Sequence, residues 1–265
     1  MMEIKIMNYN VLHGFHKVES PYSLEKERLE STQKIVYQEN PDILVLTEAC
    51  YGGENPFNIS LDYKKIFNFP YGFFGKWGNY EWGNFILSKY PLEANTTSYG
   101  ERSAIKSKIN INGKMILLDV IHPSPFLNED DKIKFTKKII KNTPKNYFLV
   151  GDFNSISDDD KYNKNILIKG FEKFDKTPEK SVNKLLERKF VPWLKSLGLK
   201  DTANKSSRVS TIPTKIYGEN MDSSLRVDFI FSSRNVKVVD TKVIKNKLTD
   251  FSSDHYPVVG TYTIN

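Results

Sequence analysis

The sequence predicts an α/β protein, in which apolar strands alternate with amphipathic helices. Residues 43–46 are apolar throughout, which is typical of a strand buried on both faces. Alternating segments flank Asn112-Gly113, a pair that supplies the positive φ angles of a two-residue hairpin turn. Residues 128–141 begin with acidic side chains and end with lysines, as suits a helix dipole. Because we find no internal repeat and no low-complexity linker, we expect a single domain over residues 1–265.

The remaining elements follow from the same patterns. Strands are expected at residues 3–11, 43–46, 84–88, 105–111, 115–121, 147–150, 225–231, 236–244 and 258–263. Ser23 is a candidate N-cap for a helix that ends near Glu39, before Pro41, and residues 182–197 form another expected helix. Residues 155–181 are polar and rich in lysine and aspartate, so we expect a loop or a short helical insertion beside the site.

Composition limits the classes of protein that this chain can be. The hydrophobic fraction of 39% suffices for a substantial core, and the lone cysteine, Cys50, excludes an internal disulfide. The first residues alternate like a strand and lack the apolar core of a signal peptide, and no stretch has membrane-spanning length, so we expect a cytoplasmic protein. A net charge of +7 favours a polyanionic partner, nucleic acid or an acidic membrane surface, with a merely lysine-rich surface as the alternative. No obligate protein partner is evident, so a monomer is expected.

Acidic side chains stand at the ends of three expected strands. Glu48 follows residues 43–46, Asp152 follows residues 147–150, and Asp254 with His255 precedes residues 258–263. Because a protein core rejects unpaired charge, acids at such positions are seldom packing devices. Carboxylates and an imidazole at strand ends are the groups that a hydrolytic metal site needs. The sequence therefore predicts a metal-assisted hydrolase.

Seven short motifs occur in an order known from one superfamily. They are Asn8-Tyr9-Asn10-Val11-Leu12, Pro41-Asp42-Ile43-Leu44-Val45-Leu46-Thr47-Glu48, Gly83-Asn84-Phe85-Ile86-Leu87-Ser88, Val120-Ile121-His122-Pro123, Gly151-Asp152-Phe153-Asn154-Ser155, Arg226-Val227-Asp228-Phe229-Ile230 and Ser253-Asp254-His255. Over residues 4–260 the chain thus resembles the endonuclease/exonuclease/phosphatase superfamily of deoxyribonuclease I-like, metal-dependent phosphoesterases. The resemblance implies a four-layered α/β sandwich, with two packed, mostly antiparallel sheets flanked by helices. It also implies hydrolysis of a phosphoester by in-line attack of water.

The resemblance implies roles for individual residues. Glu48 would be the principal ligand of Mg²⁺ or Mn²⁺, hard ions that prefer carboxylate oxygen, and Asn10 and Asp254 would complete the metal's surroundings. Asp152 would orient or deprotonate the attacking water, and Asn154 would steady Asp152. The side chains of Asp152 and Asn154 share one side if the backbone stays extended. For these acids the alternative is an ordinary capping or turn-forming role at a strand end.

Two histidines complete the expected site. By resemblance, His255 is the active-site imidazole, and Asp228 is the acid that holds it at a hydrogen-bond distance of about 2.6 to 3.2 Å. His122 would be a second imidazole, facing His255 across a cleft floored by Glu48. Asn84 would contact the phosphate as a substrate-binding residue. The alternative for the Asp-His pair is a purely structural link between two loops.

Position 122 separates branches of the superfamily. The abasic-endonuclease branch has a tyrosine there and an acid two residues after the Asn10 equivalent, whereas this chain has His122 and Leu12. A histidine is similar to the deoxyribonuclease I, sphingomyelinase and general phosphodiesterase branches, and Glu81 is a candidate to orient it. The positive charge favours nucleic acid, DNA or RNA, as the substrate. A phospholipid or sphingomyelin headgroup, a small phosphoester or inositol phosphate, and a non-catalytic binding module stay open as alternatives.

Several further segments are expected near the cleft. If the excess Lys and Arg make a basic surface near the cleft, polynucleotide binding should weaken steeply with salt; the lysines in question include Lys64, Lys65, Lys76, Lys106 and Lys108. His13 and His16 are expected to be solvent-exposed loop histidines, with lining of the cleft mouth as the alternative. The acidic run at residues 158–160 lacks the glycine and distal glutamate of a calcium loop, so a solvated turn is expected. The aromatic stretch at residues 71–82 is able to stack bases, to enter lipid, or to pack between sheet and loop.

Overall fold

The computed structural model describes residues 2–17, 23–50, 61–78, 80, 82–99, 102–140, 143–217 and 223–264, whose strands form two sheets. The first sheet contains β1 (Met2–Asn10), β2 (Ile43–Cys50), β3 (Tyr71–Lys76), β4 (Trp82–Ser88), β11 (Lys237–Val243) and β12 (Val258–Ile264). The second contains β5 (Leu92–Tyr99), β6 (Arg102–Ile111), β7 (Lys114–Ile121), β8 (Tyr147–Asp152), β9 (Leu199–Asp201) and β10 (Asp228–Ser233). Their strand orders are β11-β12-β1-β2-β4-β3 and β5-β6-β7-β8-β10-β9.

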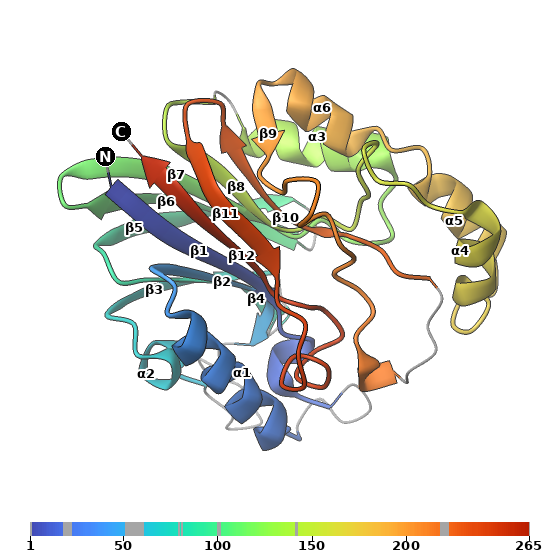
Figure 1. Cartoon of the computed structure of the whole chain (residues 1–265), viewed down its shortest axis with the longest axis horizontal. Coiled ribbons are helices and arrows are strands. Elements are labelled where there is room, and N and C mark those ends of the chain that lie inside the picture. The colour runs from blue at the N-terminus through green and yellow to red at the C-terminus, as the bar shows by residue number, and fades with distance from the viewer. Residues whose placement is uncertain are drawn as a thin grey trace.

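Both sheets are mostly antiparallel. Within the described strands, only β1 with β2 and β7 with β8 pair in parallel. The two chain ends lie side by side, because β1 runs against β12 with Met2 opposite Ile264 (Figure 1). The predicted hairpin is confirmed: β6 and β7 turn at Asn112 and Gly113, whose φ angles are 51° and 85°.

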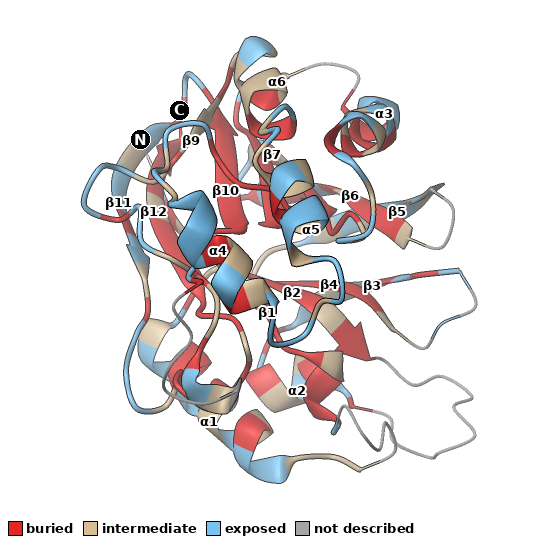
Figure 2. Cartoon of the chain, turned by 90° about the vertical axis from the view of Figure 1, so that its right-hand side faces the viewer, coloured by how far each residue is buried: buried red, intermediate tan, exposed pale blue. Residues whose placement is uncertain are grey.

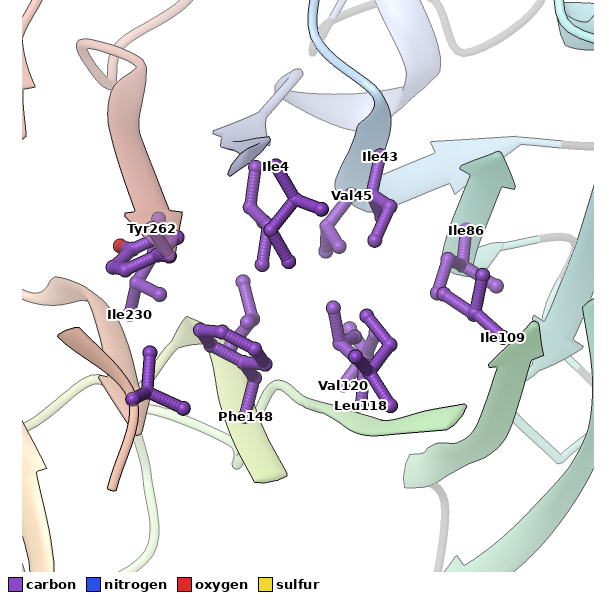
Figure 3. Close-up of a cluster of buried hydrophobic side chains, with 14 of the residues drawn as sticks. Ile4, Ile43, Val45, Ile86, Ile109, Leu118, Val120, Phe148, Ile230 and Tyr262 are labelled. Atoms are coloured by element: carbon purple, nitrogen blue, oxygen red, sulfur yellow. The ribbon is translucent and has the colours of Figure 1, made fainter. Parts of the chain in front are cut away.

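The two sheets enclose an apolar core. Side chains from the facing sides of both sheets interdigitate there (Figure 3), among them Ile4, Ile43, Val45, Ile86, Ile109, Leu118, Val120, Phe148, Ile230 and Tyr262. None of these ten is more than 1% exposed. Because removing such a side chain from water stabilises the fold by roughly 1.5–3 kcal/mol, this core holds the two sheets together.

Helices cover the outer faces of the two sheets (Figure 1). The helices are α1 (Lys26–Glu39), α2 (Tyr63–Phe67), α3 (Glu129–Ile139), α4 (Lys164–Phe171), α5 (Pro178–Leu185) and α6 (Phe190–Ser196), with 3-10 turns at His13–Phe15 and Lys215–Tyr217. Helices α1 and α2 pack on the first sheet, and α3 and α6 pack on the second. Figure 2 shows the buried strands between helices whose outer sides are exposed. The predicted four-layered α/β sandwich is therefore confirmed, and among the described residues no helix is long and apolar enough to cross a membrane.

Two helix predictions were wrong in detail. The helix expected over residues 182–197 is interrupted, because Arg188 between α5 and α6 has a φ of 49°, outside the right-handed helical region. Ser23 does not cap α1, whose N-cap is Glu25 and makes no side-chain capping bond. Helix α3, by contrast, starts as its acidic end suggested, with the Asn128 side chain accepting a bond from the Asp131 N–H. The expected insertion at residues 155–181 carries α4 and the start of α5.

Candidate active site

The candidate site lies where the facing sides of the two sheets change from apolar to polar. Alternate residues of a strand share a face, so positions two apart in one strand can be compared directly. Along seven strands an apolar residue is followed, two positions toward the same edge, by a polar one: Ile6 by Asn8, Val45 by Thr47, Ile86 by Asn84, Ile105 by Ser103, Val120 by His122, Val150 by Asp152 and Ile230 by Asp228. His122 stands directly after the last residue of β7, and the other six lie within their strands. We call the first members the apolar layer and the second members the polar layer. No member of the polar layer is more than 2% exposed.

Asp152 lies at the centre of the polar side chains. One carboxylate oxygen, Oδ2, is 3.1 Å from Asn10 Nδ2, 3.3 Å from His122 Nε2 and 3.8 Å from His255 Nε2. The other oxygen accepts the N–H of Asn154 at 2.8 Å. Burial alone would raise the pKa of Asp152, but the two imidazoles and the Asn154 N–H outweigh burial and hold that pKa well below its ordinary value. Asp152 is therefore an ionised carboxylate in a buried position.

His255 and Asp228 form a buried hydrogen-bonded pair. Asp228 Oδ2 is 2.7 Å from His255 Nδ1, within the distance that the sequence predicts. Burial opposes a charge on the imidazole, but the negative charges of Asp228, Asp254 and Asp152 raise the pKa of His255 well above its ordinary value. His255 therefore points its Nε2 toward Asp152 while its Nδ1 is held by Asp228.

Glu48 reaches the site from an irregular part of β2. The pairing of β2 with β4 shifts register between Leu46 and Ala49, and Glu48 has a φ of 56°. Its Oε1 accepts Asn10 Nδ2 at 3.2 Å, and its Oε2 accepts the His13 N–H at 3.2 Å. Burial alone would raise the pKa of Glu48, but the histidine charges and the Asn10 amide lower it overall. Because 24% of its side chain is exposed, Glu48 lies between the buried polar side chains and the solvent.

Asp254 brings a further carboxylate to the same region. Its Oδ1 is 4.0 Å from His255 Nε2, and 23% of its side chain is exposed. Burial raises the pKa of Asp254, and despite the nearby imidazole the negative charges of Glu48 and Asp152 add to that effect. The carboxylates of Glu48, Asp152 and Asp254 thus repel one another, a situation that a bound cation would relieve.

His122 lies beneath the surface and contacts a residue that sequence analysis overlooked. Its Nε2 is 3.3 Å from Asp152 and 3.9 Å from Glu48, and its Nδ1 is 3.4 Å from Nη1 of Arg102. The hairpin register contained the signal for Arg102, because pairing Ile105 with Val120 brings the start of β6 beside position 122. Both imidazoles turn their Nε2 atoms toward Asp152.

The side-chain amides of Asn154 and Asn84 donate hydrogen bonds to backbone carbonyl oxygens of the protein. Asn154 has a φ of 47°, so the backbone from Asp152 to Asn154 is not extended and the condition for a shared side is not met. Its side-chain amide donates to Pro123 O at 3.0 Å, next to His122. The Asn84 side chain is fully buried and donates to Ser103 O at 2.9 Å. The catalytic role of Asn154 and the substrate-binding role of Asn84 stay predictions.

A buried ion pair on α3 holds the segment that carries Asn154. Lys132, 3% exposed, donates from Nζ to Asn154 O, to Ser155 Oγ and to Glu129 Oε1. The other oxygen of Glu129 accepts the N–H groups of Lys189 and Phe190 at the start of α6. The backbone just after Asp152 is therefore fixed to two helices, as a preorganised site requires.

A cleft of about 670 Å³ opens beside this cluster, and we call it the aromatic cleft. Its lining comprises His13, Glu48, Trp77, Tyr80, Trp82, Arg102, Pro123, Ser124, Phe126, Leu127 and Phe135. The two loop histidines are not exposed as expected: His13 is half-buried in the lining, and His16 is 1% exposed with its Nδ1 3.1 Å from His13 O. Of the aromatic stretch, residues 71–76 form β3, whereas Glu81 lies outside the described residues.

Within the described ranges, other charged segments of the sequence do not contribute to the lining of the aromatic cleft. None of the five lysines named above lines the aromatic cleft in the part of the chain that the structure describes. Lys106 and Lys108 border a different hollow, which contains Asp119 and Tyr147. The acidic run at residues 158–160 is ion-paired rather than simply solvated, with Lys195 beside Asp158 and Asp159, and with Arg226 3.0 Å from Asp160.

Comparison with known proteins places the chain in a family. The model of the Endonuclease/Exonuclease/phosphatase family matches residues 7–255. The chain belongs to this family. No curated protein gives a significant sequence match.

Solved structures share the fold of this family member at low sequence identity. A family protein from Leptotrichia buccalis superposes with a TM-score of 0.64 and 18% identity, covering 99% of each chain. TDP2 from D. rerio, solved with a single strand DNA product, gives 0.62 and 16% identity over 98% of this chain and 99% of that one. ANGEL2, a 2',3'-cyclic phosphatase solved with adenosine-2',3'-vanadate, gives 0.63 and 15% identity over 99% and 96%. At these identities the likeness concerns the fold alone.

Proposed function

We propose that this family member is a divalent-metal-dependent phosphodiesterase in which Asp152 guides the attacking water. The proposal rests chiefly on one observation, the buried Asp152 carboxylate, whose Oδ2 has two imidazole nitrogens within 3.8 Å. Such a carboxylate can accept a hydrogen bond from a water molecule and orient it for attack on phosphorus. Asn10, which donates to the same oxygen, would keep the carboxylate in place.

We assign a metal ion to the carboxylates of Glu48 and Asp254, whose oxygen atoms suit Mg²⁺ or Mn²⁺, since Mg²⁺ usually takes only one or two protein carboxylates. Asn10 would support the ion by holding Glu48, because its Nδ2 donates to Glu48 Oε1 while its Oδ1 accepts the Leu12 N–H. Asp152, Asp228 and His255 also place ligand atoms within 4.8 Å of one another, but the hydrogen bond between Asp228 and His255 already uses that pair. When bound, the ion would supply positive charge that neutralises the phosphate.

The two imidazoles would act on opposite sides of the reacting phosphate. His255, held by Asp228 and favoured as the imidazolium, can donate a hydrogen bond to a phosphate oxygen or protonate the leaving oxygen. His122 can donate from Nε2 in the same region, since an arginine next to Nδ1 favours a lone pair on that atom. These roles for His122, His255 and Asp228 match those that the family resemblance implies.

We propose nucleic acid as the substrate class. The net charge of +7 favours a polyanion. Structural neighbours were solved with a single strand DNA product and with an adenosine phosphate analogue. Among the alternatives, a small phosphoester keeps support from the cyclic phosphatase, whose ligand is a single nucleoside derivative.

Chelation tests the metal-dependent chemistry directly. We expect EDTA to abolish hydrolysis of bis(p-nitrophenyl) phosphate, and Mg²⁺ or Mn²⁺ to restore it, because the carboxylates of Glu48 and Asp254 need a cation to accept an anionic substrate. Hydrolysis that resists the chelator would overturn the assignment. Glu48→Gln is the matched variant, and it should need a higher metal concentration for half-maximal activity.

A further inference from the structure

The aromatic cleft combines flat apolar walls with one fixed cation. Among its described lining residues, Arg102 is the only one with a permanent positive charge. The guanidinium carbon of Arg102 lies 3.7 Å from the ring centroid of Trp77, and Nη1 is 3.4 Å from Nδ1 of His122. Trp77 in turn contacts the His122 ring at a centroid distance of 5.1 Å. Arg102 is thus held flat on Trp77, immediately beside the catalytic cluster.

The mouth of the cleft carries exposed aromatic side chains. Phe126, between β7 and α3, is 87% exposed, and Tyr80, between β3 and β4, is 47% exposed. Trp82 is half-buried, with its ring 5.3 Å from that of His13. Exposed aromatic side chains around a hollow are a feature of ligand-binding surfaces. The cleft volume of about 670 Å³ lies in the usual range for pockets that hold a ligand of drug size.

We propose that the aromatic cleft binds an unpaired nucleobase of the substrate and that Arg102 binds the phosphate next to that base. The proposal rests on the phosphodiesterase function above and narrows its substrate to single-stranded nucleic acid. Aromatic side chains and arginine planes stack on bases of any sequence, because every base has a π face. In a duplex those faces are covered by neighbouring base pairs, so only an unpaired base can enter.

The charge of the cleft supports a single strand over the two main alternatives. A surface that follows duplex DNA neutralises many phosphates with Lys and Arg, whereas this lining offers Arg102 alone among the described residues. A membrane-binding surface presents apolar side chains outward from a basic face. Phe126 and Tyr80 are exposed at the mouth, but Arg102 is the only Lys or Arg side chain among the described lining residues, so the basic face is missing.

Binding measured without turnover tests the cleft proposal separately from the hydrolytic reaction. With Mg²⁺ present and Asp152→Asn as an inactive background, fluorescence anisotropy would be measured with a labelled single-stranded oligonucleotide, the same strand in a duplex, and a strand of abasic residues. We expect Phe126→Ala and Tyr80→Ala each to weaken single-strand binding on the order of tenfold, and to leave binding of the abasic strand unchanged. Phe174→Ala is the matched control, because Phe174 is 64% exposed but does not line the cleft.

The phosphate contact has its own measurement. Arg102→Gln should weaken binding of both the normal and the abasic single strand, and should lower the log-log salt slope by about 0.7, the contribution of one phosphate contact. Arg102→Lys keeps a charge and should keep the slope. Circular dichroism would establish that the variants fold, and Phe126→Ala carries the stacking test independently, since its exposed side chain supports little of the fold.

The outcomes separate failure of the cleft proposal from failure of the proposed function. Equal affinity for duplex and single strand, or equal effects of Phe126→Ala and Phe174→Ala, would overturn the cleft proposal. Binding to phosphatidylserine vesicles that Phe126→Ala abolishes, without oligonucleotide binding, would assign the aromatic mouth to lipid. Base-dependent binding together with chelator-resistant hydrolysis would instead preserve the cleft and overturn the metal-dependent chemistry.

Discussion

The apolar layer and the polar layer use the same strands two residues apart, yet they do different work. Members of the apolar layer, such as Val150 and Ile230, need only shape and hydrophobicity, and contribute by leaving water. Members of the polar layer, such as Asp152 and Asp228, each need specific partners in fixed directions. The strands thus carry catalytic groups on a rigid frame, which holds them more precisely than loops would.

The polar layer uses only part of its hydrogen-bonding capacity, whereas the apolar layer is buried throughout. Among the described residues, several of its buried side-chain atoms have no hydrogen-bond partner: both polar atoms of Asn8, Thr47 Oγ1, Asn84 Oδ1 and Asp228 Oδ1. A buried polar atom without a partner costs on the order of 1–3 kcal/mol. The difference indicates that the site is maintained at the expense of stability, and that the apolar layer offsets this cost. Substitutions in the two layers should therefore have separable effects.

The largest expected effect is on activity, from Asp152 of the polar layer and from His255, which Asp228 of that layer holds. Asp152→Asn or His255→Ala should lower turnover by on the order of a hundredfold or more, because each removes a proton-transfer or charge-stabilising group. Thermal unfolding should show that both variants still fold cooperatively. The measurement is kcat with bis(p-nitrophenyl) phosphate at saturating Mg²⁺. Undiminished activity of Asp152→Asn would remove Asp152 from the mechanism.

The second-largest expected effect is a loss of stability, caused by a substitution in the core around the apolar layer. Phe148 is fully buried between the sheets and contacts the Tyr262 ring at a centroid distance of 5.0 Å. Phe148→Ala should lower the free energy of unfolding by about 3–5 kcal/mol, because it leaves a cavity. Urea denaturation measures this change. The folded fraction should keep its kcat, and a fall in kcat like that of Asp152→Asn would show that the layers are not separable.

Some parts of the fold could be predicted from local sequence patterns, and others could not. Strand positions, the hairpin turn at Asn112 and Gly113, and the acids at strand ends are local signals, and they predicted an α/β fold with a polar site at strand ends. The four-layered sandwich was predicted from the resemblance of the motifs to a known superfamily. Strand β5 was not predicted, because its Leu92–Tyr99 segment is largely polar and lies at a sheet edge. Edge strands bury only part of their surface, so their hydrophobic pattern is weak.

Partners that belong to different elements could not be predicted from local pattern. The contact of Arg102 with Trp77 and the buried pair of Lys132 with Glu129 depend on how β3, β6 and α3 pack together. His13 is half-buried because its backbone N–H donates a hydrogen bond to Glu48. The composition of the loop around His13 does not predict this contact. Tertiary packing decides such contacts, and a single sequence records only the residues that make them.

A third prediction, of intermediate size, compares the buried carboxylates of Asp119 and Asp152. Asp119 is 4% exposed and accepts a bond from Tyr147 OH at 2.9 Å, but no histidine contacts it among the described residues. Burial raises the pKa of Asp119 to about 6, opposite in direction to Asp152. The folded state therefore binds this proton more tightly than the unfolded chain does. The resulting stability is present below the unfolded pKa, near 3.8, and is lost as pH rises through about 6.

Asp119→Asn should remove this pH dependence. Since one pKa unit corresponds to about 1.36 kcal/mol, the variant should be more stable than the wild type by up to about 3 kcal/mol above neutral pH. Near pH 4 the difference should be small, because both residues are then neutral. Urea denaturation of both proteins across this pH range measures the difference. A constant difference at all pH values would mean that Asp119 is ionised in the folded protein, as Asp152 is.

The smallest expected effect concerns a polar atom placed beyond the apolar layer. Ser232 lies two residues past Ile230 on the facing side of β10, fully buried, and its Oγ has no partner among the described residues. Ser232→Ala should stabilise the fold by about 1 kcal/mol, because it removes an unsatisfied hydroxyl and leaves little space. Ser107→Ala is the matched control, since Ser107 is 4% exposed and donates to Leu118 O across β6 and β7.

Ser107→Ala should destabilise the fold by about 1 kcal/mol, because it removes a satisfied buried hydrogen bond. Opposite signs for the two serines, measured by urea denaturation, would show that partnering rather than polarity decides the cost of a buried group between the sheets. The unpartnered Asn8 in the polar layer would then be expected to behave like Ser232. Equal signs would mean that the sheets respond only to lost volume, and the cost assigned to the polar layer would have to come from its charges.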